Sequence, residues 1–341
     1  MTDSLKPLLE TLLEGNDLTE AEASSIMTAL ADDSVAPPLA GALLAALRAK
    51  GETADEIRGF AAIMRARAVK PNLDRSLPLV DTVGTGGDGS GSYNLSTGAG
   101  LLAAAAGAKV VKHGNRSVSS KSGSADMLES LGLSLPVPVD RVAECLDASG
   151  FTFLFAPAFH PAMKAVVPIR QAMGVRTVFN VLGPLTNPAL PPFQLIGAFS
   201  LEVAKLMAEA LAGLDIQRAF VVHGDNGWDE ATPVSAFTLF DVTPGRVEIN
   251  VRAPEDYGVA RCDALALAGG DAAANATALK AVLSGDDTGP HRDALLMGTS
   301  LVLEVAGLVD DPLAGVARAA RAIDDGSALA VLDNLAAFSH G

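Results

Sequence analysis

A glycine-rich stretch follows an apolar run that ends near residue 83. Residues 81–97 read DTVGTGGDGSGSYNLST and hold five glycines within eight positions. The spacing that starts at Gly84 matches G-x-G-x-x-G, but a dinucleotide site also needs a helix opening at the third glycine and an acidic residue about 20 positions later. Residues 90–92 extend the loop instead, and no Asp or Glu occurs between Asp88 and Asp126. These features argue against a dinucleotide site.

Two other interpretations of the same loop fail. A Walker loop would end in Gly-Lys-Ser or Gly-Lys-Thr, and no lysine lies between this loop and Lys109. A flexible linker is not expected between a buried strand and the helix after it. What remains is a bare backbone whose N–H groups can close on phosphate, next to the positive N-terminus of a helix that is predicted to begin near Ser96 and Thr97.

The charge distribution favours an anionic ligand at this place. Residues 89–125 contain no acid but carry four basic side chains and His113; the four are Lys109, Lys112, Arg116 and Lys121. The stretch KHGNRSVSSKSGSADMLESLG (112–132) follows the second predicted strand, so both loops leave the carboxyl ends of strands, where α/β sheets bind ligands. Lysine and arginine usually form a solvated surface. Their concentration among Gly, Ser and Asn here favours a binding site.

A third segment offers carboxylates. The stretch HGDNGWDEATP (223–233) closes another predicted strand and contains the adjacent acids Asp229 and Glu230. Adjacent carboxylates usually mark a solvated loop. At the end of a strand and opposite a phosphate cradle, they would instead hold Mg²⁺ together with phosphate and water. The residues alone thus describe a magnesium-assisted site for a polyphosphorylated ligand, with no evident Ser or Cys nucleophile.

The elements that must position these residues fall into two groups. The first seventy residues read as four short helices, with capping boxes at Thr19/Glu22 and Thr53/Glu56 and a further start at Ser34. Five leucines share one face of the first helix: Leu5, Leu8, Leu9, Leu12 and Leu13.

After a polar connection at 70–78, short apolar runs alternate with alanine-rich helical stretches. This alternation predicts an α/β domain with a largely parallel sheet. The predicted strands are 79–83, 109–111, 151–155, 194–198, 219–223 and 237–242. The predicted helices are 96–107, 122–131, 139–148, 160–173, 201–213, 271–284, 290–306, 311–324 and 327–338.

Composition limits the classes of function. The 341 residues are 49% hydrophobic and 19% charged, as in ordinary globular proteins, and the net charge of −15 works against nucleic-acid binding. Two cysteines, Cys145 and Cys262, indicate a reduced compartment. The start MTDSLKPLLE does not look like a signal peptide, and the uncharged run 95–108 is too short to span a bilayer. We therefore expect a cytoplasmic protein without a membrane or nucleic-acid partner.

Taken together, four segments resemble the anthranilate phosphoribosyltransferase family over essentially the whole chain. They are the two loops above, FLFAPAFHPAMKAVVPIRQAMGVRTVFNVLGPLTNPA (153–189) and VVHGDNGWDEATP (221–233). The resemblance implies an α/β fold of the nucleoside phosphorylase/phosphoribosyltransferase type, with a small all-helical domain and a large α/β domain around a central, mostly parallel sheet. Residues 1–70, joined by helices from about 160–185, would form the small domain, and residues 71–341 the large one. A homodimer paired through the small domains is also implied.

The implied reaction is Mg²⁺-dependent transfer of a phosphoribosyl group from phosphoribosyl pyrophosphate (PRPP) to the amino group of anthranilate, in tryptophan biosynthesis. Pyrophosphate is released, with inversion at ribose C1. By resemblance, the PRPP-binding residues are Gly84, Gly87, Asp88, Ser92, Asn94, Ser96, Thr97, Lys112, Ser120 and Ser124. The anthranilate contacts are Gly84, Asn115, His160 and Arg170. The metal ligands are Ser96, Asp229 and Glu230, and the residues assigned to catalysis are Arg170, His113 and Lys112.

Several points stay open at this stage. A structural hydrogen-bonding role for His113 or His160 is as reasonable as a chemical one. Residues 179–188 are expected to shape an apolar wall, and Trp228 could alter the mouth of the site. The alternatives are a pyrimidine-nucleoside phosphorylase of the same fold, which would attack C1 with phosphate and need no Asp-Glu metal pair, and a non-catalytic relative that binds nucleic acid.

Overall fold

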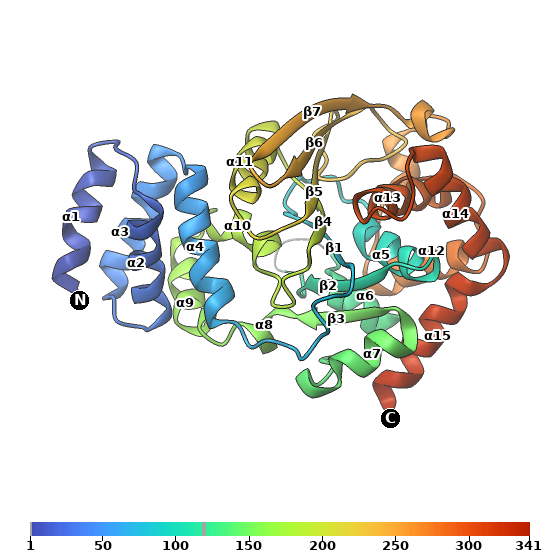
Figure 1. Ribbon diagram of the computed structural model, residues 1–341, viewed down its shortest axis with the longest axis horizontal. Helices are drawn as coiled ribbons and strands as arrows, with labels where there is room; N and C mark the ends of the chain where they lie inside the picture. The colour runs from blue at the N-terminus through green and yellow to red at the C-terminus, as the bar shows by residue number, and fades with distance from the viewer. Residues whose placement is uncertain (1, 118–120) are drawn as a thin grey trace.

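The computed structural model describes residues 2–117 and 121–341, and it shows a helical part on one side of an α/β part (Figure 1). The helical part opens with four helices: α1 (Thr2–Leu13), α2 (Glu20–Ala31), α3 (Pro37–Lys50) and α4 (Ala54–Arg67). The two predicted capping boxes are present at the starts of α2 and α4, where Thr19 and Thr53 each exchange hydrogen bonds with the glutamate three residues later.

Of two predictions for these helices, one is confirmed and one is wrong in detail. The helix start marked by Ser34 ahead of Pro37–Pro38 is confirmed, because α3 begins at Pro37; only a cap by Ser34 is missing, since its hydroxyl donates to the carbonyl of Ala29. In α1, Leu5 and Leu12 are buried, whereas Leu13 is 64% exposed. Leu5 and Leu12 lie two turns apart on one face, and Leu13 is rotated about 100° from Leu12, so a stripe narrower than predicted packs against α3.

The sheet has seven strands in the order β3-β2-β1-β4-β5-β6-β7. Neighbours from β3 to β5 pair in parallel, and β6 and β7 add an antiparallel edge, so the predicted mostly parallel sheet is confirmed. Strand β7 was not predicted: its RVEINVR sequence alternates polar and apolar residues but has no continuous apolar run, and the strand is largely exposed. The strands are β1 (Leu79–Gly84), β2 (Lys109–Gly114), β3 (Phe151–Phe155), β4 (Phe193–Gly197), β5 (Arg218–Gly224), β6 (Phe237–Thr243) and β7 (Arg246–Arg252).

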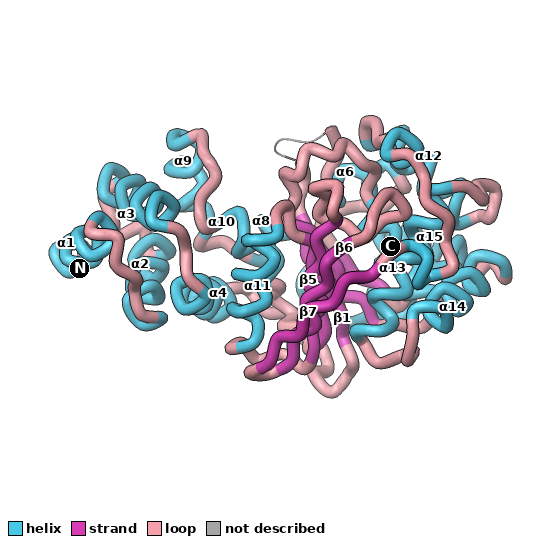
Figure 2. The backbone as a smooth tube through the Cα atoms, turned by 90° about the horizontal axis from the view of Figure 1, so that it is seen from above, coloured by secondary structure: helices cyan, strands magenta, loops and turns pink. Residues whose placement is uncertain are grey.

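Helices cover both faces of the sheet, and Figure 2 shows them on either side of it. Helices α5, α7, α13 and α15 contact strands on one face, and α11 contacts β5, β6 and β7 on the other. The remaining helices are α5 (Leu95–Ala105), α6 (Ser124–Ser130), α7 (Val142–Ser149), α8 (Ala156–Phe159), α9 (Met163–Met173), α10 (Phe179–Leu182), α11 (Leu201–Ala212), α12 (Ala272–Leu283), α13 (Pro290–Val305), α14 (Pro312–Asp324) and α15 (Ser327–His340). Short 3₁₀ turns occupy η1 (Val139–Arg141), η2 (Gly183–Thr186), η3 (Pro254–Tyr257) and η4 (Ala264–Leu267).

The segment between β3 and β4 returns to the helical part. Helix α9 contacts α2 and α3, and α10 and η2 contact α4, so this excursion lies beside the N-terminal helices (Figure 1). A buried cluster links the helical part to the sheet, because Phe60 of α4 and Phe179 of α10 share it with Val221 of β5. Among the described residues, no helix is long and apolar enough to cross a membrane.

Candidate active site

The glycine loop after β1 lies against the acidic loop after β5. The N–H of Gly86 donates to Oδ2 of Asp229 at 2.6 Å, and the N–H of Asp229 donates to a carboxylate oxygen of Asp88 at 3.3 Å. A Cβ at Gly84 would overlap the Asp229 carboxylate, and a Cβ at Gly197, where β4 ends, would overlap its carbonyl oxygen. The missing side chains on neighbouring strands thus let three segments meet at the carboxyl edge of the sheet, as expected for a ligand site.

A second set of contacts surrounds the start of α5. The N–H of Ser96 donates to the Glu230 carboxylate at 3.2 Å, and the Lys112 ammonium donates to the Ser96 hydroxyl at 3.3 Å and to the carbonyl of Thr82. Lys112 is only 2% exposed, and burial lowers its pKa, while the charges of Asp81 and Glu230 raise it. Lys112 is therefore a cation held inside the protein at the base of the cradle.

The surroundings of Asp229 and Glu230 disfavour the ionised form of both carboxylates. Burial raises the pKa of Asp229 to about 7, with Asp88 adding to the shift, and burial and the charge of Asp229 raise the pKa of Glu230 to about 8. These oxygens and the hydroxyl of Ser96 are donors that suit a hard divalent cation such as Mg²⁺. Among the described residues, no group of three or more His, Cys, Asp or Glu side chains could hold a metal ion by itself. A metal here would need ligand oxygens from elsewhere, and phosphate can supply them.

The loop after β2 is tied to the glycine loop through Asn94. Its side-chain amide donates to the carbonyl of Ser122, and its oxygen accepts from the Ser122 hydroxyl and from the amide of Asn275 in α12. Ser124, at the start of α6, donates to the carbonyl of the exposed Asn115 at 3.2 Å. Ser120, which was expected to bind PRPP, lies outside the described residues.

The basic residues that suggested an anion site do not all face it. Lys109 begins β2, at the opposite end of that strand from the loop. Arg116 forms ion pairs with Glu129 and Asp126, which offset its charge. Lys112 alone among the four has a hydrogen bond in the described structure to a residue of the expected PRPP site. Counting the basic residues of 89–125 in the sequence therefore overestimates the positive charge that is available to a ligand.

His113 and His160 form a buried pair on the other side of β2. Their ring centroids lie 5.1 Å apart, and neither Nε2 has a hydrogen-bond partner among the described residues. Burial lowers the pKa of His113 to about 3 and also lowers that of His160, so both are neutral near pH 7. Because side chains alternate along a strand, Lys112 and His113 face opposite sides of the sheet. The structure does not join the expected catalytic residues in one contact group.

A polar network beneath this pair was missed by sequence reasoning. The carboxylate of Asp81 accepts from the backbone N–H of His113 at 3.2 Å and from the Asn187 amide at 2.8 Å. That amide also donates to the carbonyl of Val111. Residues 179–188, expected to be an apolar wall, thus include a buried polar side chain that fixes the end of β2. Asn187 is followed by Pro188 in a loop, and nothing in this local sequence indicates that the asparagine binds a buried carboxylate.

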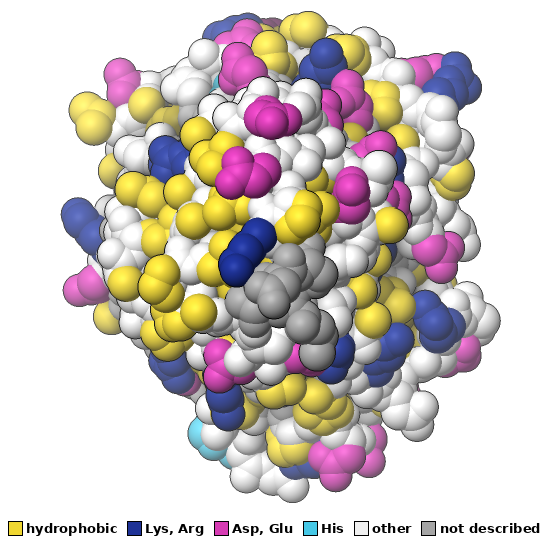
Figure 3. Space-filling view, turned by 90° about the vertical axis from the view of Figure 1, so that its left-hand side faces the viewer, with side chains coloured by type: hydrophobic (Ala, Val, Ile, Leu, Met, Phe, Trp, Pro, Cys, Tyr) yellow, Lys and Arg dark blue, Asp and Glu magenta, His cyan; other side chains and the backbone are white. Residues whose placement is uncertain are grey.

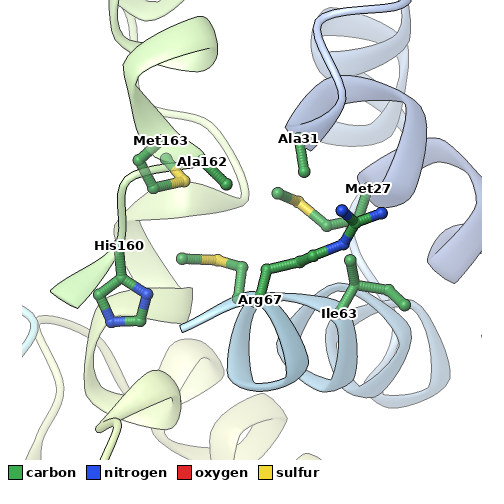
Figure 4. Close-up of a pocket in the computed structure, with 8 residues that line it drawn as sticks. Met27, Ala31, Ile63, Arg67, His160, Ala162 and Met163 are labelled. Carbon is green, nitrogen blue, oxygen red and sulfur yellow. The ribbon is translucent and has the colours of Figure 1, made fainter. Parts of the chain in front are cut away.

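Arg170 lies in α9, where its guanidinium stands 5.3 Å from the ring centre of Phe179. Burial lowers its pKa, and the guanidinium makes no hydrogen bond or ion pair with any described residue, although the backbone carbonyl of Arg170 accepts from the N–H of Gly174. Close to His160, a cavity of about 10 Å³ lies between α2, α4 and the start of α9 (Figure 4). This volume is room for about one water. Its lining is Met27, Ala31, Ile63, Met64, Arg67, His160, Ala162 and Met163.

The side chains of three loop residues contact other residues of the protein: Ser92, Tyr93 and Trp228. The hydroxyl of Ser92 lies 3.2 Å from that of Ser90, and Tyr93 is buried and donates to the carbonyl of His291 in α13. Trp228 is buried in the core and does not line a site mouth. Thr97 is also buried, and its hydroxyl has no hydrogen-bond partner among the described residues, so it is a polar group available to a ligand or water.

The chain is similar to known proteins over nearly its full length. Residues 6–68 match the helical bundle domain of the Glycosyl transferase family, and residues 76–329 match its a/b domain. The anthranilate phosphoribosyltransferase of Chloroflexus aurantiacus is 44% identical over 339 residues, which is 99% of either chain. That of Anaeromyxobacter sp. (strain K) is 48% identical over 326 residues, or 96% of either chain.

Solved structures give the same picture. The crystal structure of anthranilate phosphoribosyltransferase from Thermus thermophilus matches with a TM-score of 0.91 at 43% identity, covering 98% of this chain and 99% of that one. The enzyme from Saccharomyces cerevisiae in complex with PRPP and Mg matches with a TM-score of 0.88 at 28% identity, covering 98% and 97%. A complex of the yeast enzyme with 4-fluoroanthranilate has a TM-score of 0.86 at 27% identity and covers 98% of both chains.

Proposed function

Because the chain belongs to the anthranilate phosphoribosyltransferase family and has the transferase activity of that family, we propose that the loops described above hold its two substrates and Mg²⁺. The observation that carries this proposal is the meeting of the glycine loop, the start of α5 and the acid pair. Gly86 contacts Asp229 at 2.6 Å, and Ser96 contacts Glu230 at 3.2 Å.

The phosphate end of PRPP is proposed to lie on the glycine loop and the start of α5. The loop N–H groups now bonded to carboxylates are anion donors, and the N-terminus of α5 adds positive potential. Lys112 supports this end from beneath through the Ser96 hydroxyl. The same proposal assigns PRPP contacts to Gly84, Gly87, Asp88, Ser92, Asn94, Thr97, Ser120 and Ser124.

Mg²⁺ is proposed to bind through Asp229, Glu230 and Ser96, with PRPP oxygens completing its shell. When bound there, it would neutralise charge that develops on the leaving pyrophosphate. The raised pKa of each carboxylate, caused first by burial, marks a place where a cation would relieve an unfavourable charge. Lys112, which is 2% exposed, is proposed to contribute fixed positive charge in the same region.

Anthranilate is proposed to lie on the side of Arg170, Asn115, His160 and Gly84. Arg170 would orient the substrate carboxylate, since its guanidinium is partly buried and has no acidic partner among the described residues. Holding the weakly basic amine in line with ribose C1 can supply several kcal/mol by proximity. His113 joins Lys112 and Arg170 as the proposed catalytic residues; because burial lowers the pKa of His113 to about 3, its proposed role is to position groups as a neutral ring and not to take up a proton.

We propose further that residues 1–70 with the α9–α10 excursion form the small domain, that residues 71–341 form the large one, and that the protein acts in the cytoplasm. The contacts of α9 with α2 and α3 support the domain division. The assay that tests the function is the loss of anthranilate fluorescence with PRPP and Mg²⁺. We expect consumption that stops in excess EDTA. Consumption of a pyrimidine nucleoside with phosphate, and none of anthranilate, would favour the phosphorylase alternative.

A further inference from the structure

An arginine that the reaction scheme does not use lies on the glycine loop. The guanidinium of Arg176, in the connection between α9 and α10, donates to the carbonyl of Gly87 across 89 residues of sequence. It lies so close that a Cβ built on Gly87 would be 3.2 Å from its Nη2. Arg176 forms no ion pair with a described residue, although the carboxylates of Asp88 and Asp229 belong to the same site.

The guanidinium rests on a platform that belongs to the same site. Its Cζ lies 4.4 Å from the ring centre of Phe199, and the N–H of Phe199 donates to the hydroxyl of Thr85 at 3.1 Å. Thr85 is the residue that opens the glycine loop, and its own N–H donates to the carbonyl of Gly197. Arg176 therefore lies over the ring of a residue whose backbone N–H is bonded to the loop. Stacking of this kind restricts a guanidinium to a narrow set of positions.

The other end of Arg176 is bonded to the helical part. Its backbone carbonyl accepts from the Arg48 guanidinium of α3 at 2.6 Å. A short path of contacts thus runs from α3, through Arg176, to Gly87 at the phosphate cradle. The glycine loop has left-handed glycines at Gly86, Gly87, Gly89 and Gly91. Glycine can adopt many backbone conformations, so a contact from outside the loop helps to keep its backbone in one shape.

We propose that Arg176 is a positioning residue for PRPP: it holds the glycine loop in its phosphate-binding shape and couples that shape to the helical part through Arg48. This rests on the proposed function, because it takes the loop to be the phosphate cradle. The unpaired charge adds electrostatic attraction for the pyrophosphate. Binding of anthranilate does not depend on it directly, since Arg170 serves that substrate.

The test compares Arg176→Met, Arg176→Lys and Arg48→Met by steady-state kinetics and by calorimetry with PRPP and Mg²⁺. Loss of a hydrogen bond from a charged group should raise the KM and Kd for PRPP by about tenfold or more in Arg176→Met. The kcat and the KM for anthranilate should stay within about threefold, because the lost interaction acts on binding of one substrate. Arg176→Lys should recover part of the affinity, since it keeps the charge and one donor but cannot stack flat.

A separate comparison of variants tests the coupling between the glycine loop and the helical part. Arg48→Met should raise the KM for PRPP less than Arg176→Met does, and the double variant should be no worse than Arg176→Met alone. Arg141→Met is the matched control, because Arg141 also stacks on a phenylalanine ring, 4.3 Å above Phe338, but lies away from the cradle. This control should leave both KM values unchanged.

The outcomes distinguish failure of the proposed function from failure of the positioning role of Arg176. If the wild-type protein does not bind PRPP with Mg²⁺, the proposed function fails, whatever the variants do. If the wild type binds and Arg176→Met keeps its KM for PRPP, or loses both substrates equally, the positioning role is overturned. Additive effects in the double variant would overturn the coupling. If Arg176→Met fails to fold by circular dichroism, Arg176→Lys and Arg48→Met carry the same comparison.

Discussion

At the scale of single residues, the carboxylates of Asp229 and Glu230 give the site a pH signature. Their folded pKa values, about 7 and about 8, lie above the ordinary 3.8 and 4.5. The folded protein therefore keeps protons that the unfolded chain has released, and its stability falls as pH rises through this window. We expect the Tm of the ligand-free protein to fall by a few degrees or more between about pH 5 and pH 8 and to level off above pH 8. Differential scanning fluorimetry across this range measures it.

The matched variants identify the groups responsible. Asp229→Asn combined with Glu230→Gln should flatten this decline and abolish turnover, because both the repulsion and the proposed metal ligands are removed. Asp225→Asn removes an exposed carboxylate from the same loop and should keep the wild-type slope. PRPP with Mg²⁺ should also reduce the slope in the wild type by favouring the ionised form. An unchanged slope in the double variant would refute the assignment.

At the scale of elements, the glycine loop allows a comparison between two equal backbone conformations. Gly87 and Gly89 both have φ +74°, but a Cβ at Gly87 would come 3.2 Å from Arg176, whereas one at Gly89 would meet no described atom within 4 Å. Alanine in this left-handed conformation costs about 1 kcal/mol at either position. We expect similar small losses of Tm for Gly87→Ala and Gly89→Ala, and a KM for PRPP that rises about tenfold more in Gly87→Ala.

Thermal-shift titration with PRPP and Mg²⁺ provides the second measurement. Stabilisation by a ligand depends on its concentration relative to its Kd, so weaker binding appears as a smaller shift. Gly87→Ala should lose much of the shift that Gly89→Ala retains. If both variants respond like the wild type, the loop does not cradle the phosphates.

At the scale of the whole molecule, the helical part presents apolar side chains to solvent. Leu13 of α1, Val167 of α9 and the nearby Val175 are 64%, 42% and 53% exposed. Figure 3, which looks onto this end, shows hydrophobic side chains spread over much of the face. Exposed apolar patches of this kind commonly mark interfaces between subunits. We propose that two chains pair here.

Sedimentation velocity tests that pairing. The wild type should run as a dimer, and Val167→Asp should shift it toward monomer, because a charge in an apolar interface is costly. Leu265→Asp changes a leucine of the α/β part that is more exposed, at 83%, and should leave the association state unchanged. A monomeric wild type, or a dimer that tolerates Val167→Asp, would show that the helical face is not the interface.

The sequence alone determined the features that depend on a few neighbouring residues. Capping boxes such as Thr19 with Glu22 place helix starts, apolar runs place β1 to β6, and the four segments quoted above identified the family. These signals are local, since a capping box spans four residues and strands β1 to β6 have five to seven each. The edge strand β7 was not predicted although its RVEINVR sequence alternates polar and apolar residues, because it lacks the continuous apolar run by which the other strands were identified.

Only the tertiary structure decided which side chains meet. It placed Lys112 under Ser96 and turned His113 to the other side of the sheet, brought Asn187 to Asp81, and set Arg176 on Gly87. Such contacts join residues far apart in the chain, and they depend on which strands become neighbours and how loops cross their ends. A pattern of residue types cannot encode that adjacency, because the same polar side chain fits many partners until packing selects one.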